Sequence, residues 1–112
     1  MTPKLSRRGV LAGAAACAVV PTSHLMAAPA MHIVEIKKLK FVPETIEIRL
    51  GDTIKWVNKD IAPHTATALT KSWDSKRLKK NQSFELTVTK ETETAYFCIY
   101  HPHMQGVIAV VD

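Results

Sequence analysis

Short runs in which apolar and polar residues alternate with a period of two constrain the fold of this chain more than any other feature. The run TIEIRL places Ile46, Ile48 and Leu50 on one face, with charged residues between them. After a Gly-Asp turn signal, the run TIKWVN places Ile54 and Trp56 on one face. Because the side chains of a strand alternate between its two faces, the pattern predicts two half-buried strands joined by a tight turn.

Three later runs continue this pattern. Residues 83–88 (SFELTV) alternate, and residues 94–98 (TAYFC) and 106–111 (GVIAVV) are typical of further strands. The last run is apolar on both faces, which predicts a central strand. No stretch has a convincing helical period, and residues 76–81 are expected to form one turn of helix at most. Regularly spaced short strands predict an all-β domain, either an antiparallel sandwich or a barrel.

Side chains that bind soft metals are crowded into the run CIYHPHM near the C-terminus. Cys98, His101 and Met104 have the spacing C-x2-H-x2-M, and a further histidine, His64, follows the strand TIKWVN. One thiolate and two imidazoles in a plane, with a thioether as a long axial ligand, form the donor set of a blue-copper site. The sequence therefore predicts a metal centre with four ligands: His64, Cys98, His101 and Met104.

The second histidine of this run leaves one alternative open. Copper sites with the spacing C-x4-H also occur, and they need a methionine several residues further on. Met104 is adjacent to His103, and no methionine follows it. Since neighbouring side chains in an extended segment point apart, we interpret His103 as a surface residue near the metal rather than as a ligand.

The first 30 residues are typical of an export signal. A basic start containing an arginine pair is followed by residues 9–20, an apolar run shorter than the about 20 residues that span a bilayer. We expect cleavage after Ala28 or Ala30. The run SRRGVL favours a twin-arginine signal, with an ordinary Sec signal as the alternative. The chain is therefore divided into an export signal (1–30) and a periplasmic domain (31–112) without a stable membrane insertion.

The cysteine content also favours a metal site. Cys98 is the one cysteine of residues 31–112, since Cys17 lies in the leader, so an internal disulfide is excluded. An unpaired thiol in an oxidising compartment is a liability unless it is buried, used or bound. A domain of about 80 residues is small for a stable core, and a bound metal would stabilise its folded state.

Two motifs resemble those of the cupredoxins, and most closely those of the amicyanin and plastocyanin-like family. The run CIYHPHM is similar to that family's ligand loop, C-x2-H-P-x-M. The run WVNKDIAPH is similar to its upstream motif, W-x-N-x5-H with proline before the histidine. The resemblance covers about residues 41–112, and the chain departs from the family pattern at Tyr100 and Thr65.

The resemblance implies a Greek-key antiparallel β-sandwich with one copper ion near one end. It implies that this copper cycles between Cu(I) and Cu(II) and carries single electrons, so that no catalytic residue is expected. The implied partners are redox proteins, a c-type cytochrome or a periplasmic dehydrogenase or oxidase, and the protein is expected to be a monomer. We expect the Thr65 N–H to donate to the Cys98 sulfur, and Asn58 to fix the ligand loop to its neighbour.

Charge and the remaining residues limit the competing functions. Residues 31–112 carry 12 Lys and Arg residues against 10 Asp and Glu residues, and a net charge of about +2 is too small to predict nucleic-acid binding. The basic run Lys76–Lys80 is interpreted as a solvated loop, with a docking patch as the alternative. A copper-delivery protein would expose spare ligands, and only His32 and His103 remain. An enzyme with Cys98 as nucleophile would need an oxyanion motif, which the sequence does not offer.

Overall fold

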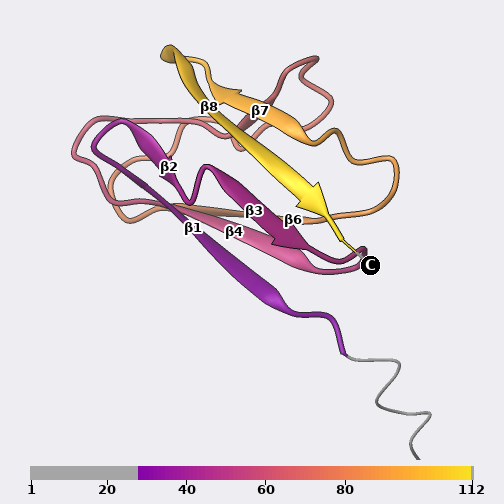
Figure 1. Cartoon of the computed structure of the whole chain (residues 1–112). Coiled ribbons are helices and arrows are strands. Elements are labelled where there is room, and N and C mark those ends of the chain that lie inside the picture. The colour runs from indigo at the N-terminus through magenta and orange to yellow at the C-terminus, as the bar shows by residue number, and fades with distance from the viewer. Residues whose placement is uncertain (1–27, 112) are drawn as a thin grey trace, which may run out of the picture.

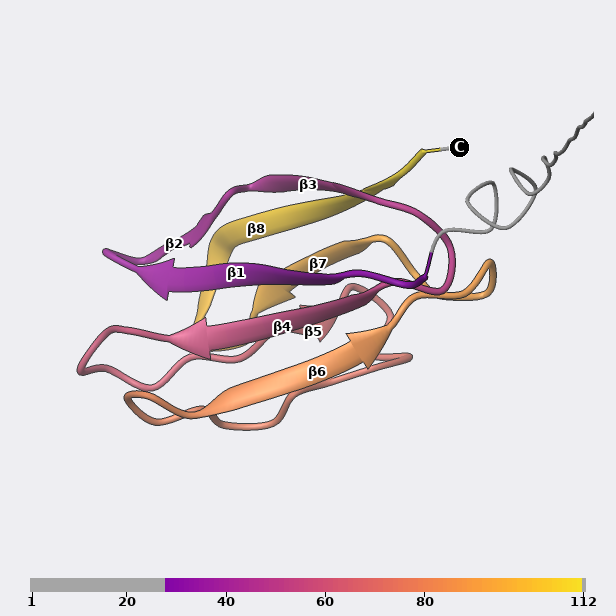
Figure 2. The ribbon, with the colours of Figure 1, turned by 90° about the horizontal axis from the view of Figure 1, so that it is seen from below.

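The computed structural model describes residues 28–111, which form two β-sheets packed face to face (Figure 1 and Figure 2). The predicted all-β sandwich is therefore confirmed. The described residues contain no helix, and so none that is long and apolar enough to cross a membrane. Residues 1–27 of the predicted export signal lie outside the described part of the chain.

Each sheet has four strands. The first sheet contains, in spatial order, β2 (Lys40–Val42), β1 (Met31–Lys37), β4 (Thr53–Asn58) and β6 (Ser83–Thr87). The second contains β3 (Thr45–Ile48), β8 (His101–Val110), β7 (Ala95–Cys98) and β5 (Thr67–Ala68). Strands that are neighbours in the sequence are thus often in different sheets, as in a Greek key.

Both sheets are mixed, because each contains one parallel pair. Strand β1 runs parallel to β4, and β3 runs parallel to β8. The other four pairs are antiparallel, as the sequence led us to expect. A period of two specifies which face of a strand is buried but not the direction of its neighbour, so the two parallel pairs could not be predicted from the alternation.

The core is built around the indole of Trp56, which is fully buried. Its ring centroid lies 5.3 Å from that of Tyr96, 5.3 Å from that of Trp73 and 5.8 Å from that of Phe84. Ile54, on the same face of β4, is also fully buried. The alternation of β4 is therefore confirmed, and the aromatic rings join the two sheets.

Two details differ from the sequence-based expectation. Strand β3 ends at Ile48, so Leu50 lies in the following turn and is 51% exposed. Gly51 closes that turn with a φ of 95°, a backbone conformation that glycine adopts without steric cost. Strand β8 lies between β3 and β7 and is central as predicted, but Val107 and Val110 are 45% and 42% exposed. In a sandwich only the inner face of each sheet is covered by the other sheet. A strand with apolar residues on both faces can therefore still expose those on its outer face.

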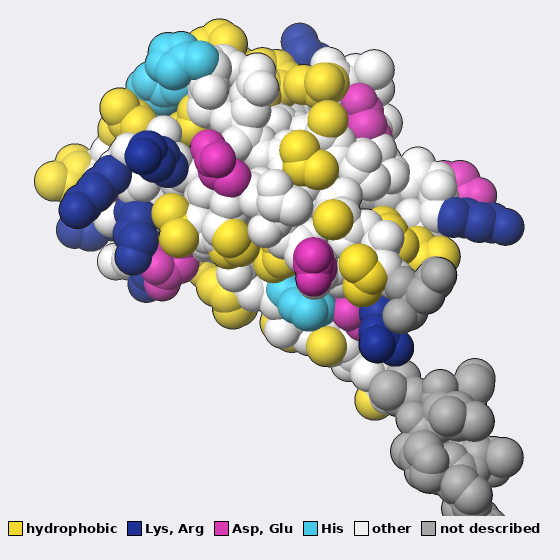
Figure 3. All heavy atoms as spheres, in the orientation of Figure 1, with side chains coloured by type: hydrophobic (Ala, Val, Ile, Leu, Met, Phe, Trp, Pro, Cys, Tyr) yellow, Lys and Arg dark blue, Asp and Glu magenta, His cyan; other side chains and the backbone are white. Residues whose placement is uncertain are grey.

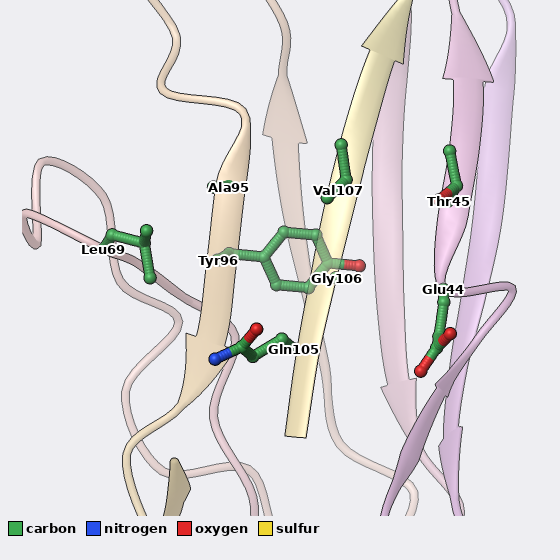
Figure 4. Close-up of a pocket in the computed structure, with 8 residues that line it drawn as sticks. All are labelled: Glu44, Thr45, Leu69, Ala95, Tyr96, Gln105, Gly106 and Val107. Atoms are coloured by element: carbon green, nitrogen blue, oxygen red, sulfur yellow. The ribbon is translucent and has the colours of Figure 1, made fainter. Parts of the chain in front are cut away.

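Strand β8 approaches the buried ring of Tyr96 closely at Gly106 (Figure 4). A Cβ atom at Gly106 would lie only 2.3 Å from Cζ of that ring. Burial raises the pKa of Tyr96 to about 12. Because Gly106 has no side chain, β8 leaves room for the Tyr96 ring. A pocket of about 260 Å³ lies beside the ring and is lined by Glu44, Thr45 and Leu69 among others. This pocket contains none of the predicted metal ligands.

Candidate metal centre

Three of the four predicted ligands lie together: His64 from the loop after β4, Cys98 from the end of β7 and His101 from the start of β8. The Cys98 Sγ atom is 3.7 Å from His64 Nδ1 and 3.8 Å from His101 Nδ1. All three donor atoms lie within 4.8 Å of one another, and no other such group of three occurs in residues 28–111. An ion in a trigonal plane, about 2.3 Å from a thiolate and about 2.0 Å from two imidazoles, would hold sulfur and nitrogen about 3.7 Å apart. The spacing fits one ion bound by these atoms.

The predicted ligands Cys98 and His101 face each other across a very short connection. Cys98 is the last residue of β7 and His101 is the first of β8, and the two are paired in the sheet. The sequence suggested a longer loop that would also contain Met104. In the structure residues 101–104 are already part of β8, and a register irregularity at Phe97 and Cys98 accommodates the turn. The pairing of β7 with β8 therefore positions His101 directly.

The alternation along β8 separates Met104 from His103. The Met104 side chain is 4% exposed and belongs to the same buried cluster as Cys98. His103 is exposed. The expectation that these two neighbours point to opposite sides is confirmed, and it leaves Met104 as the buried thioether of the CIYHPHM run.

Thr65 holds the cysteine from the neighbouring loop. Its backbone N–H donates a hydrogen bond to Cys98 Sγ at 3.4 Å, which confirms the expected contact. Its hydroxyl oxygen accepts a bond from the Ile99 N–H at 2.9 Å. One residue therefore fixes both the sulfur atom and the backbone that follows it, and a donor to sulfur stabilises the thiolate form.

His64 is fully buried and is held by its backbone. Its N–H donates to the Leu78 carbonyl at 3.1 Å, and the Leu78 N–H donates back at 2.8 Å. The Asn58 side-chain amide donates to the carbonyl oxygens of Leu78 and Ala62, both at 2.9 Å. These bonds tie the loop that carries His64 to the segment around Leu78. None of the hydrogen bonds of Asn58 in the described residues reaches the CIYHPHM ligand loop, so the prediction that Asn58 fixes that loop is wrong.

Asp60 orients the imidazole of His64, and the sequence analysis missed it. Its Oδ2 atom lies 2.9 Å from His64 Nε2. A carboxylate oxygen can only accept this hydrogen bond, so Nε2 of His64 carries the proton. The lone pair of Nδ1 then faces the Cys98 sulfur. Burial alone would raise the pKa of the Asp60 carboxyl, but bonds from the amides of Leu39 and Lys38 and from His64 outweigh it, so the pKa is lowered. The available signal was the position of Asp60, four residues before the histidine.

We expect Asp60→Asn to weaken copper binding about 10- to 100-fold, because the imidazole loses the charged acceptor that fixes its tautomer. Competition against a Cu(I) chelator measures this affinity. The control is Glu91→Gln, which removes an exposed carboxylate outside the site. Equal affinities for the wild type and Asp60→Asn would contradict the role given to Asp60.

Known proteins with the same architecture include several amicyanins. The chain is 29% identical to the amicyanin of Paracoccus denitrificans over 83 residues, which cover 70% of this chain and 63% of that protein. A Cu(I) form of an amicyanin variant superposes with a TM-score of 0.64 at 31% identity, over 78% of this chain and 88% of that one. A copper-containing nitrite reductase from Thermus scotoductus superposes with a TM-score of 0.66 at 26% identity, over 76% of this chain but only 23% of the enzyme.

A family model supports the same relationship over almost the whole chain. Residues 9–110 match the model described as a cupredoxin-like domain. The two packed sheets, and the paired cysteine and histidine at the junction of β7 and β8, agree with this match. The chain therefore belongs to the family of cupredoxin-like domains.

Proposed function

We propose that this protein is a type 1 (blue) copper protein that carries single electrons. The observation that carries the proposal is the position of Cys98 Sγ, 3.7 and 3.8 Å from the Nδ1 atoms of two histidines. His64, Cys98 and His101 would hold the copper, and Met104 would supply a fourth ligand through its thioether sulfur. The similarity to amicyanins supports this assignment.

The donor atoms suit copper in both of its oxidation states. Thiolate and thioether sulfur favour Cu(I), while imidazole nitrogen binds both Cu(I) and Cu(II). When bound, the copper supplies the one-electron couple. The protein contributes rigidity: Asp60 holds His64, and Thr65 holds Cys98. Fixed ligands keep rearrangement small when an electron arrives, and the partly exposed His101 offers the route between the metal and the surface.

The proposed setting is the periplasm, with redox proteins as partners. We propose that the leader is an export signal and that the mature domain is a monomer that exchanges electrons with a c-type cytochrome, a dehydrogenase or an oxidase. The Ala30 N–H donates to Asp52 at 2.9 Å, and its carbonyl accepts from the Thr53 N–H at 2.9 Å. Cleavage after Ala28 would keep both bonds, whereas cleavage after Ala30 would remove them.

Copper delivery through the same ligands is the second candidate. It would require the metal to leave readily. His64 and Cys98 are fully buried and Met104 is nearly so, and a delivery protein would need more accessible ligands. An enzyme is not proposed, although the nitrite reductase neighbour is one, because the similarity covers only 23% of that chain.

Titration of the mature protein with Cu(II), followed by visible and EPR spectroscopy, tests the proposal. An electron carrier should give an intense blue band and a narrow copper hyperfine splitting, both saturating at one copper per chain. A fast, reversible one-electron couple should accompany them. A weakly coloured complex with ordinary hyperfine splitting, or rapid transfer of the metal to a chelator, would instead support copper delivery.

We expect Met104→Ala to retain copper but to change the reduction potential, because a weak axial ligand tunes the couple more than it holds the metal. Voltammetry of the variant and the wild type measures the difference. The matched control is Met31→Ala at the exposed start of β1, which should leave the potential unchanged. A potential equal to that of the wild type would mean that Met104 acts only in packing.

A further inference from the structure

Exposed basic side chains are concentrated around the end of the sandwich that holds the candidate metal centre. We call six of them the basic cluster: Lys38, Lys40, Lys59, Arg77, Lys79 and Lys80. They come from three connections that are far apart in the sequence: residues 38–40 at the turn from β1 into β2, the loop that begins at Lys59 after β4, and residues 77–80 before β6. Figure 3 shows Lys and Arg side chains gathered at one end of the molecule, next to exposed histidine.

Hydrogen bonds tie the first and third of these connections to the second, which carries His64. The Lys38 N–H donates to Asp60 Oδ1, while Asp60 Oδ2 binds the ligand His64. The Lys59 N–H donates to the Ile36 carbonyl at 2.7 Å. The third connection is joined through Leu78, whose backbone pairs with that of His64 and whose neighbours in sequence are Arg77 and Lys79. The connections that carry the basic side chains therefore lie next to one loop of the candidate metal centre.

The positive charge of the basic cluster is not neutralised within the described residues. None of its six members forms an ion pair there. The nearby Asp60 carboxylate is already occupied by His64 and by two backbone amides. Apart from the basic cluster and Asp60, residues 31–112 contain nine acidic residues and six basic ones. The small net charge thus conceals a polarised molecule that is positive at the metal end.

We propose that the basic cluster is the docking surface for a redox protein that presents an acidic face. The inference rests on the proposed electron-carrier function, and it specifies the partner's charge. Complementary charges accelerate association and orient two proteins before contact, which suits a short-lived electron-transfer encounter. Ile61 is 86% exposed in the same loop as Lys59 and provides an apolar contact among the charges. Apolar contact within a charged rim is the usual composition of a protein interface.

Electron exchange with small charged reagents tests the local charge. Ferricyanide, an anion, takes one electron from the Cu(I) protein and leaves ferrocyanide and the Cu(II) protein; tris(phenanthroline)cobalt(III) is the cationic counterpart. We compare Lys59→Glu/Lys79→Glu with Arg49→Glu/Lys90→Glu, a control with the same change in net charge. The control residues lie near Asp52 and Val88, at the opposite end of β4.

At low ionic strength the cluster variant should react about tenfold more slowly with ferricyanide than the wild type, and faster with the cobalt reagent. The control should change less than twofold. The differences should fade at 0.5 M salt, where charges are screened over a few ångströms. Equal effects of the two double variants would overturn the docking proposal alone. Failure of the wild type to exchange electrons with either reagent would overturn the proposed function.

A binding measurement that does not depend on copper provides a second test. Metal-free protein labelled with ¹⁵N is titrated with a hexaglutamate peptide. The amide shifts should be confined to the three connections of the basic cluster and to the Ile61 loop, and they should be lost in the Lys59→Glu/Lys79→Glu variant. Shifts spread over the whole surface, or centred near Lys90, would contradict the assignment.

Discussion

Cys98→Ala is expected to abolish the intense blue absorption while leaving a folded, metal-free protein. The colour of a blue copper site comes from the covalent copper–thiolate bond, and Cys98 is the one cysteine in the described residues. The folding cost should be small, about 1–2 kcal/mol, because one buried sulfur atom and the hydrogen bond from the Thr65 N–H are lost. Visible absorption and near-UV circular dichroism together separate loss of metal from loss of fold.

His103→Ala is the matched control, since His103 is exposed two residues beyond the proposed ligand His101. This variant should remain blue, and its hyperfine splitting should not change. A blue Cys98→Ala protein would refute the ligand assignment. Loss of colour in His103→Ala would revive the alternative spacing, in which the second histidine of the run binds the metal.

Gly106→Ala is expected to destabilise the domain by about 3 kcal/mol. The new Cβ would lie 2.3 Å from Tyr96 Cζ and 2.4 Å from its hydroxyl oxygen. The ring is fully buried and packs against Phe41 at 4.7 Å and Trp56 at 5.3 Å between centroids, so it cannot move aside without disturbing the core. Overpacking of this kind typically costs about 1–3 kcal/mol. Urea unfolding of the metal-free protein measures the loss.

A second substitution separates this overlap from a general effect on strand β8. Adding Tyr96→Leu to Gly106→Ala should recover part of the lost stability, because the shorter side chain removes the clash. Gln105→Ala, at the exposed neighbouring position, should change stability by about 0.5 kcal/mol or less. Simple additivity of the Gly106 and Tyr96 substitutions would mean that the two residues do not compete for space.

The architecture explains why the site combines rigidity with access to the surface. His64 is delivered by the loop after β4, in the first sheet, while Cys98 and His101 are delivered by β7 and β8 in the second. The metal centre therefore joins the two layers at one end. The proposed ligands are fixed by backbone pairing on both sides, and the ring of the partly exposed His101 lies 5.1 Å from that of His64 between centroids.

The alternation and the two motifs were sufficient to predict much of this protein from its sequence. Period two identified the strands with Ile54 and Trp56 inside, because the pleat of a strand imposes that period on any half-buried sheet. The spacing in CIYHPHM separated Met104 from His103, because adjacent residues of an extended chain face opposite sides. The contact of Thr65 with Cys98 was also anticipated, since Thr65 directly follows the predicted ligand His64.

Only the tertiary structure determined which distant segments meet. The parallel pairs, the bond from His64 to Asp60 and the approach of Gly106 to Tyr96 depend on contacts between elements, which a local pattern does not encode. The basic cluster is the strongest example. Its six basic residues are scattered between residues 38 and 80 in a sequence of nearly balanced charge. They form one surface only because the three connections that carry them lie at the same end of the β-sandwich.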